Sequence, residues 1–475
     1  MKKRPSLFYS LLPILFLVFA LFINVRIFGD SSLDGSNQLI LLLAAGFAAI
    51  LAKFKGINTN DIWSGIQGTL QDSTKAVLIL LMVGALTGSW MVSGIIPTLI
   101  VFGLKILSPI IFLPASVVVC ALISLATGSS WGTTATIGIA LMGVGQSLGF
   151  PPTWIAGAVI SGAYFGDKMS PISDTTNLAP AMAGAELANH IRYMALTSGP
   201  AVIITLIVFT FMGLGFDNGL LSGDIQILSD ELSSRFNISA WLLLVPILSI
   251  GLIALRIDAV AAMGVGAILG ALTAFFVQPE IIAEVGGSSD IVGHYKGILT
   301  SLYGSVSLEM KNPLLNSLLR TKGMSGMLGT IWLVICALTF GGVLEASKFL
   351  TRITEAFLSV ANSSASLIIS TLITCGFINV TAADQYLAIV VPGRMFKKAY
   401  SKRGLAPENL SRALEDSGTV TSVLVPWNTC GAYQSATLGV ATGDYFIYCF
   451  FNWLSPIINL SLALSGIRIK KIKIV

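Results

Sequence analysis

Gly162-Ala-Tyr-Phe-Gly-Asp-Lys-Met-Ser-Pro-Ile-Ser-Asp-Thr-Thr-Asn177 is a polar segment in an otherwise apolar chain, and the rest of the architecture can be worked out from it. It contains two carboxylates, one ammonium group and five hydroxyl or amide side chains. Ionisable side chains are costly inside a membrane, so a cluster of them marks a functional site by default. The two glycines and the proline predict an interrupted helix, whose free backbone groups can bind ions.

The composition places the chain in the membrane class. Soluble domains carry about 25% charged residues, whereas this chain carries 11%, with 54% hydrophobic residues and a mean hydropathy of +0.84. The five cysteines form no C-x-x-C pair, and the two histidines show no ligand spacing, so no cofactor is expected. The sequence shows neither a nucleophile–base pair nor a phosphate loop, which argues against an enzyme. The net charge is +5, but aromatic residues are not interleaved with the Lys and Arg residues, so nucleic acid is not an expected partner.

Long apolar segments predict an all-α polytopic membrane protein with about 10–12 transmembrane segments. Shorter apolar pieces with Gly or Pro at their ends are too short to cross alone, and they predict half-helices or re-entrant hairpins. The long segments are 8–25, 38–52, 76–92, 110–126, 200–216, 240–255, 259–277, 327–344, 365–380 and 445–464. The short pieces are 95–107, 136–148, 154–165, 387–391 and 420–426.

The distribution of basic residues predicts how the chain sits in the cell (inner) membrane. Cytoplasmic flanks carry an excess of Lys and Arg, so both termini are expected in the cytoplasm and the acidic loop with Asp30 and Asp34 outside. The first apolar run lacks a cleavage pattern and is expected to remain as a span. The basic residues at the termini are Lys2, Lys3, Arg4, Arg468, Lys470, Lys471 and Lys473.

An internal repeat divides the chain. At an offset of 255 residues Cys120 corresponds to Cys375 and Pro171 to Pro426, while Ser129, Ser161 and Ser173 fall on Asp384, Asp416 and Asn428. Interrupted apolar segments at matching places in two halves point to a transporter binding site. The expected organisation is N-terminal transmembrane helices over 1–75, a first repeat with connecting helices over 76–277, a polar linker over 278–325, and a second repeat over 326–475.

The polar breaks supply the ligands that an alkali cation needs, because hydroxyls, amide carbonyls, free backbone carbonyls and carboxylates all bind hard cations. Na⁺ is expected at Ser129, Asp174, Thr175 and Asn177. The opposing interpretation is that Ser and Thr hydroxyls bond back to their own helix, which is common in membranes. The full set of candidate cation or substrate ligands is Ser129, Ser130, Thr133, Thr134, Ser170, Asp174, Thr175, Asn177, Thr381, Asp384, Asn428 and Thr429.

Three acidic residues, Asp167, Asp174 and Asp384, are candidates for coupling to protons. Competition for one carboxylate is enough for antiport, since Na⁺ binds the ionised form and H⁺ displaces it. The alternative for Asp167 is an ion pair with Lys168 or another basic side chain, because structural pairs also stabilise charge within membranes.

The segment 162–180 resembles the signature of the NhaC-type sodium/proton antiporter family. The segments 84–97, 127–134, 416–419 and 426–429 resemble it too. The resemblance implies two inverted structural repeats with re-entrant hairpins and discontinuous helices, and a secondary transporter that exchanges Na⁺ for H⁺ by alternating access. The family also contains malate/lactate exchangers, so its resemblance does not fix the substrate.

The main alternative is therefore a Na⁺/H⁺-coupled exchanger of an organic anion or of amino-acid-related substrates. An organic anion needs positive charge or helix N-termini at the site. Lys168 and Arg394 are the candidates for the charge, and the half-helices that begin at glycine are candidates for the N-termini. A membrane enzyme or receptor is the third hypothesis. The expected partners are Na⁺, H⁺ and membrane lipid, with a small organic anion and a second copy of the chain as further options.

Overall fold

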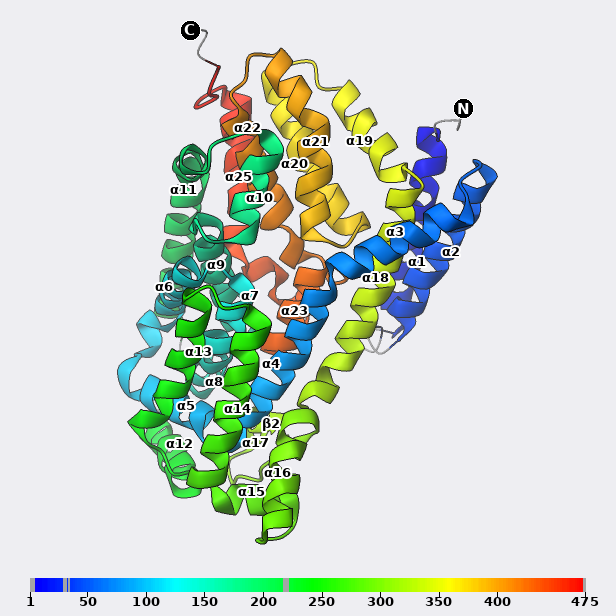
Figure 1. Ribbon diagram of the computed structural model, residues 1–475. Helices are drawn as coiled ribbons and strands as arrows, with labels where there is room; N and C mark the ends of the chain where they lie inside the picture. Colours follow the sequence, from blue (N-terminus) through cyan, green and yellow to red (C-terminus); the bar gives the residue numbers. More distant parts are fainter. Residues whose placement is uncertain (1–4, 29–31, 33–34, 217–221, 473–475) are drawn as a thin grey trace.

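A computed structural model describes residues 5–28, 32, 35–216 and 222–472. Within these residues the fold is almost entirely helical, as the sequence predicted. Eight helices are long and apolar enough to cross a membrane, or up to ten if each of two bent helix pairs is one span. The described ends of the chain, α1 and α25, lie at the same end of the bundle (Figure 1). Lys2, Lys3, Arg4, Asp30, Asp34 and Lys473, used above for orientation, lie outside the described residues.

The N-terminal helices form one flank of the molecule. α3 lies across the bundle and leads into α4 through a short turn at Ser73 (Figure 1). α3 and α2 pack against α18, and α1 packs on α2. Gly65 and Gly342 allow this close approach, because a Cβ on Gly65 would lie 2.7 Å from the carbonyl oxygen of Gly342. The bounds are α1 (Leu7–Phe28), α2 (Ser36–Phe54), α3 (Thr59–Asp72), α4 (Thr74–Val92) and α18 (Leu328–Ala346).

The first repeat contains a hairpin and a broken helix. α6 runs to the middle of the bundle, reverses at Gly128, and returns through α7, a π-helix and α8. Gly128 has φ +65°, and a Cβ there would lie 2.7 Å from the Ile172 side chain, so this reversal needs glycine. α9 and α10 form the broken helix. The bounds are α5 (Ile95–Ile106), α6 (Pro109–Thr127), α7 (Ser130–Thr133), η2 (Thr134–Gly138), α8 (Ile139–Ser147), α9 (Pro152–Met169), α10 (Asp174–Ala183) and α11 (Leu187–Leu214).

The second repeat contains the same parts. α20 and α21 form its hairpin, and the run from α22 through η6 is separated from α23 by a break at Pro426. The bounds are α19 (Phe349–Ser359), α20 (Ser364–Thr381), α21 (Gln385–Lys402), α22 (Pro407–Ala413), η5 (Leu414–Thr419, a π-helix), η6 (Ser422–Leu424), α23 (Thr429–Leu438), α24 (Thr442–Tyr445), η7 (Phe446–Tyr448) and α25 (Phe450–Ser465).

The elements between the repeats cover the opposite end of the bundle from the termini (Figure 1). The segment 278–325, expected to be a polar linker, contains short helices and the two-stranded sheet, in which Val306 pairs with Thr321. α16 packs on α4, where a Cβ on Gly88 would overlap the carbonyl oxygen of Ser301. The bounds are α12 (Ser222–Arg235), η3 (Ala240–Leu243), α13 (Leu244–Ala254), α14 (Ala259–Val277), α15 (Pro279–Gly286), α16 (Ile291–Tyr303), β1 (Val306–Ser307), α17 (Pro313–Leu318), β2 (Arg320–Thr321) and η4 (Met324–Met327).

The helix bounds of the two repeats match at the offset of 255 residues. Shifted by this offset, α10 falls on α23 at both ends, and α6 falls on α20 within one residue. The helices α10 and α23 also end alike, at Gly184 with φ 82° and Gly439 with φ 69°. α4 and α18, which correspond at this offset, run in opposite directions through the bundle (Figure 1). An inverted relation between the repeats remains a prediction.

Candidate functional site

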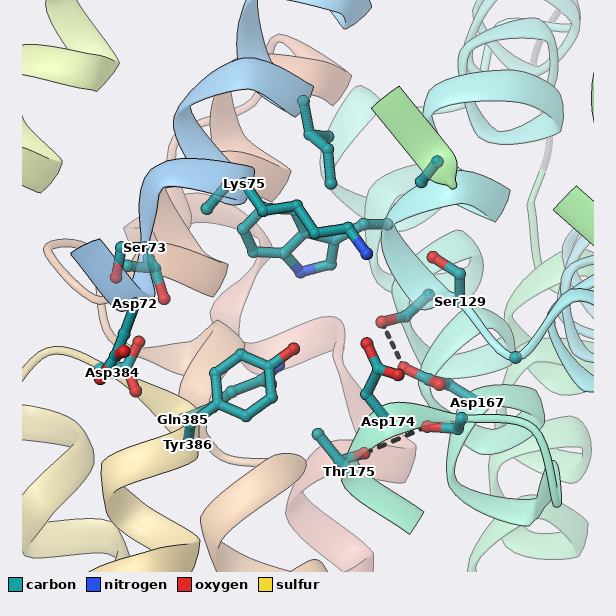
Figure 2. A pocket seen from close by; sticks show the side chains of 18 residues that line it. Asp72, Ser73, Lys75, Ser129, Asp167, Asp174, Thr175, Asp384, Gln385 and Tyr386 are labelled. Carbon is teal, nitrogen blue, oxygen red and sulfur yellow. Dashed lines mark hydrogen bonds between the residues drawn. The ribbon is translucent and has the colours of Figure 1, made fainter. Parts of the chain in front are cut away.

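Two hairpin tips and two helix breaks meet in the middle of the bundle. The tip at Gly128 and the tip at Asp384 face each other across a cavity of about 170 Å³, called the central cavity below (Figure 2). Residues on both sides of the α9–α10 break and at the joint between α3 and α4 also line it. Broken helices place free backbone groups and helix ends where a ligand can reach them. The polar residues lining it are Asp72, Ser73, Lys75, Ser129, Ser130, Asp167, Ser173, Asp174, Thr175, Asp384, Gln385, Tyr386 and Thr429.

Both hairpin tips end in the same kind of helix cap. Ser129 precedes α7, and its Oγ accepts a hydrogen bond from the backbone N–H of Gly132 (3.0 Å). Asp384 precedes α21, and its Oδ1 accepts from the backbone N–H of Leu387 (2.9 Å). Side-chain oxygens at this position satisfy amides that the helix leaves free. The N-termini of two helices, which carry partial positive charge, therefore face the central cavity.

Two carboxylates from the α9–α10 break lie on one side of the central cavity. Asp167 is 8% exposed, and its Oδ2 accepts a hydrogen bond from Ser130 Oγ (2.7 Å). Its Oδ1 is buried and has no hydrogen-bond partner among the described residues. Asp174, in the first turn of α10, is exposed to the cavity, whereas Asp72 and Asp384 lie on the far side, with Tyr386 between the two groups (Figure 2). Asp167 thus has an oxygen available for a cation or a proton.

The wall of the central cavity is built from equivalent positions of the two repeats. At these positions each repeat contributes two polar residues and one aromatic residue from its hairpin, and the first residue of the helix after its break. The hairpin aromatic Trp131 also stacks on Tyr433 of the other repeat, with ring centroids 3.9 Å apart. The pairs that line the cavity are Ser129 with Asp384, Ser130 with Gln385, Trp131 with Tyr386, and Asp174 with Thr429.

Of the predicted ligands, the structure brings Ser129, Ser130, Asp174, Thr175, Asp384 and Thr429 to the central cavity, and Asp167 as well. The other six lie away from its wall and bond to nearby backbone or amide groups. Thr133, Thr134 and Thr381 donate to carbonyls four residues earlier (2.9, 2.8 and 2.8 Å). Ser170 donates to Leu125 O (2.8 Å), Asn177 to Ser173 O (2.7 Å), and Asn428 to Asn379 O (3.1 Å).

Lys168, the predicted anion contact, does not line the central cavity. Its ammonium forms an ion pair with Asp416 of the second repeat, and the side chains of both are 0% exposed. It also donates to Ser455 Oγ (2.6 Å). The neighbouring carboxylate Asp167 is bound by Ser130 instead, because adjacent residues of a helix point in different directions. The sequence analysis offered Lys168 as a possible ion-pair partner of Asp167, whereas in the structure Lys168 pairs with Asp416.

Several cavity residues were missed by the sequence analysis. Asp72, Ser73 and Lys75 enter at the joint between α3 and α4, and Lys75 Nζ lies 3.0 Å from Asp258 Oδ2. A second cavity of about 440 Å³, called the side cavity below, shares Asp72 and Asp384 with the central one. The side cavity adds Glu345 and Arg394 to its walls. The signal in the sequence that could have indicated these residues is the polar joint 72–75, directly before the long apolar segment 76–92.

The donor set suits a hard monovalent cation. Carboxylate and hydroxyl oxygens dominate the wall, and such oxygens are the preferred ligands of hard cations. In the described part of the chain no group of three or more His, Cys, Asp or Glu side chains could hold a metal ion. The cavity therefore fits a transported ion that binds through a few carboxylate and hydroxyl oxygens better than a resident transition metal.

Comparisons with known proteins identify the family of the chain. The sequence model described as the Na⁺/H⁺ antiporter family matches residues 162–467. The chain is 36% identical to the Na⁺/H⁺ antiporter NhaC of Alkalihalophilus pseudofirmus, over 91% of this chain and 90% of that protein. It is 35% identical to the malate-2H⁺/Na⁺-lactate antiporter of Bacillus subtilis, over 95% and 92%. It is 31% identical to the arginine/ornithine antiporter ArcD of Halobacterium salinarum, over 98% and 93%.

Proposed function

Because the chain belongs to the Na⁺/H⁺ antiporter family, we propose that it is a secondary transporter that exchanges Na⁺ for H⁺ across the cytoplasmic membrane. The observation that carries this proposal is the central cavity, where two hairpin tips and a helix break gather Asp167, Asp174 and Asp384. Carboxylates at such a place bind either a cation or a proton. Exchange follows if both ions compete for the same oxygens.

The mechanism uses this competition directly. Na⁺ binds the ionised carboxylates Asp174 and Asp167, with hydroxyl oxygens such as Thr175 as further ligands. Protons then displace Na⁺ when the cavity faces the more acidic side. Ser130 donates to Asp167 Oδ2 (2.7 Å) and holds this carboxylate in place, while Oδ1 stays free for the exchanged ion. Asp384 and Asp72 add negative charge across the cavity, which attracts cations.

Alternating access is supported by the arrangement of the hairpins. The α6–α8 hairpin and the α20–α21 hairpin enter from opposite ends of the bundle, and their tips meet at the central cavity (Figure 1). α4 and α18 run in opposite directions, as inverted repeats require. Rocking of one repeat against the other would open the cavity to one side at a time. Both described ends of the chain lie at one end of the bundle, which supports termini on the same side of the membrane (Figure 1).

A second candidate function is exchange of an organic anion or an amino acid coupled to these ions. Relatives of similar identity are named for malate and lactate and for arginine and ornithine. The observation that favours it is basic side chains on the cavity walls: Arg394 in the side cavity, and Lys75 in the central cavity, where it forms a half-exposed ion pair with Asp258. A carboxylate substrate can pair with such cations. Lys168 supports this function less, because its ammonium is occupied by Asp416.

The test is transport by the purified full chain in liposomes with internal pH recorded. Na⁺, Li⁺ and K⁺ are offered first, and then malate, lactate and arginine. We expect Na⁺ to drive proton movement, and Asp174→Asn to abolish it. Asp230→Asn is the matched control, because it is the same kind of substitution at an exposed residue of α12, away from both cavities. Proton movement driven by an organic substrate but not by Na⁺ alone would replace the first proposal by the second.

A further inference from the structure

A second polar cluster lies behind the central cavity and does not line it. Its centre is the ion pair of Lys168 with Asp416. Lys168 directly follows the cavity residue Asp167 in the chain. Asp416 also accepts hydrogen bonds from Ser455 (2.8 Å) and Asn459 (2.7 Å). The central cation site and this cluster are therefore adjacent, joined by two consecutive residues of α9.

Glu415 stands out within this cluster because it has no partner. Its side chain is 0% exposed, and neither carboxyl oxygen has a hydrogen-bond partner in the described residues. It lies in η5, a π-helix, a rare conformation that occurs frequently at functional sites. A buried carboxyl without partners is much cheaper when it carries a proton than when it is ionised. This conformation therefore suits the protonated form of Glu415.

Three charged groups act electrostatically on Glu415 and influence whether it holds a proton. Those that act on it are the ammonium of Lys168 and the carboxyl groups of Asp167 and Asp416. Loss of the proton would leave a carboxylate that can compete with Asp416 for Lys168. Of the other elements packed against η5, α20 and α25 carry no charged residue. The charged residues of α10, α21 and α22 are Asp174, Arg394, Lys397, Lys398, Lys402, Glu408 and Arg412.

Polar groups connect the cluster to the end of the bundle that carries the described ends of the chain. Asn459 Oδ1 accepts from Arg412 Nη2 (3.3 Å), and the Arg412 guanidinium lies 4.3 Å from the centroid of the Tyr193 ring. Tyr193 is partly exposed, and the backbone N–H of Lys470 donates to its hydroxyl (3.2 Å). Beside this route Arg412 Nε and Nη1 and His190 Nε2 are buried without partners in the described residues. Unpaired buried polar groups of this kind are commonly satisfied by ordered water.

We propose that Glu415 is a proton-binding site separate from the central cation site, and that protons reach it through the polar groups from Tyr193 to Asp416. This inference rests on the proposed Na⁺/H⁺ exchange. Glu415 takes up a proton from water at the end of the bundle and becomes neutral. When it releases the proton, its carboxylate attracts the ammonium of Lys168. Lys168 directly follows Asp167, which lines the cation site. Occupancy of the two sites is thereby coupled without a shared ligand.

Three measurements on the full chain in liposomes test the proposal. The first is Na⁺-driven proton movement, and the second is exchange of radioactive for unlabelled Na⁺ at equal pH, which needs no net proton transfer. The third is the infrared difference spectrum between acidic and alkaline buffer, in which a protonated buried carboxyl gives a C=O band. The variants are Glu415→Gln, Glu415→Asp and the control Thr437→Val, another buried side chain without a partner among the described residues.

We expect Glu415→Gln to lower Na⁺-driven proton movement at least about tenfold, to keep Na⁺/Na⁺ exchange within about twofold, and to remove one carboxyl band. Glu415→Asp should restore part of the proton movement, and Thr437→Val should match the wild type. Unchanged proton movement in Glu415→Gln would overturn the proposal, and so would equal loss of both exchange modes. A wild type without Na⁺-driven proton movement would refute the proposed function, while an unchanged carboxyl band in Glu415→Gln would refute only the proton site.

Discussion

The buried pair of Lys168 and Asp416 makes the sharpest prediction for stability. Lys168→Met keeps most of the side-chain volume but leaves the Asp416 carboxylate with only neutral partners, at 2.7–3.0 Å from Asn459, Ser455 and Thr197. Removing one member of a buried ion pair costs about 3–5 kcal/mol, because the remaining charge stays buried. At about 1.4 kcal/mol per factor of ten, this lowers the ratio of folded to unfolded protein at least about 100-fold.

The double variant separates the charge from the packing. Lys168→Met with Asp416→Asn removes both charges and keeps both volumes, so it should be more stable than either single variant. We expect a coupling free energy of at least about 2 kcal/mol in the double-mutant cycle. The control is Glu355→Gln, which breaks the partly exposed pair of Arg352 and Glu355 (3.9 Å) and should cost at most about 1 kcal/mol.

The measurement is equilibrium unfolding in mixed micelles with increasing denaturing detergent, followed by the near-ultraviolet signal of the tryptophans. Each variant is purified and measured in the same lipid-containing micelles as the wild type. Additive effects of the two single substitutions would refute the reasoning, since they would mean that the charges do not depend on each other. A Lys168→Met variant as stable as Glu355→Gln would refute it as well.

Three further substitutions probe the central cavity and its scaffold. Ser130→Ala removes the hydrogen bond to Asp167, worth about 1.5–3 kcal/mol for a charged group, so the KM for Na⁺ in proton exchange should rise about tenfold or more. Gly166→Ala would place a Cβ 2.2 Å from a backbone carbonyl of α6, so the apparent melting temperature should fall, whereas Gly199→Ala meets nothing within 4 Å and should preserve it. Asp384→Asn should keep the fold, because Asn caps helices as well as Asp, and yet lose exchange, measured as Na⁺-driven proton movement.

The sequence could predict the breaks because they leave a local signal. A proline, glycines and hydroxyl side chains interrupt apolar segments at Pro171 and Pro426, and both positions are helix breaks in the structure. The hairpin tips were equally visible, because Gly128 and Asp384 interrupt apolar runs. The shared offset then predicted which parts of the two halves correspond.

The residues that sequence analysis assigned poorly are those whose partners are distant in the chain. Lys168 and Asp416 are 248 residues apart, and α25 packs against both α9 and η5, the elements that carry them. For hydroxyl side chains the missing information is local geometry. Thr133 and Thr134 have the right chemistry for a cation, but their oxygens bond to the carbonyls of their own helix. Side-chain direction decides between these roles, and the order of residues alone does not contain it.

The two repeats supply the same backbone but different chemistry, and this difference is what a cation site requires. At the helix cap, Ser129 in one repeat stands where the other has Asp384, and after the break Asp174 stands where the other has Thr429. Each of these two pairs therefore contributes one carboxylate and one hydroxyl. Carboxylates at all four positions would repel one another, and four hydroxyls would bind Na⁺ too weakly to compete with water. The matching backbone of the two halves gives the cavity its shape, while the differences between equivalent positions limit how many carboxylates face one another across it.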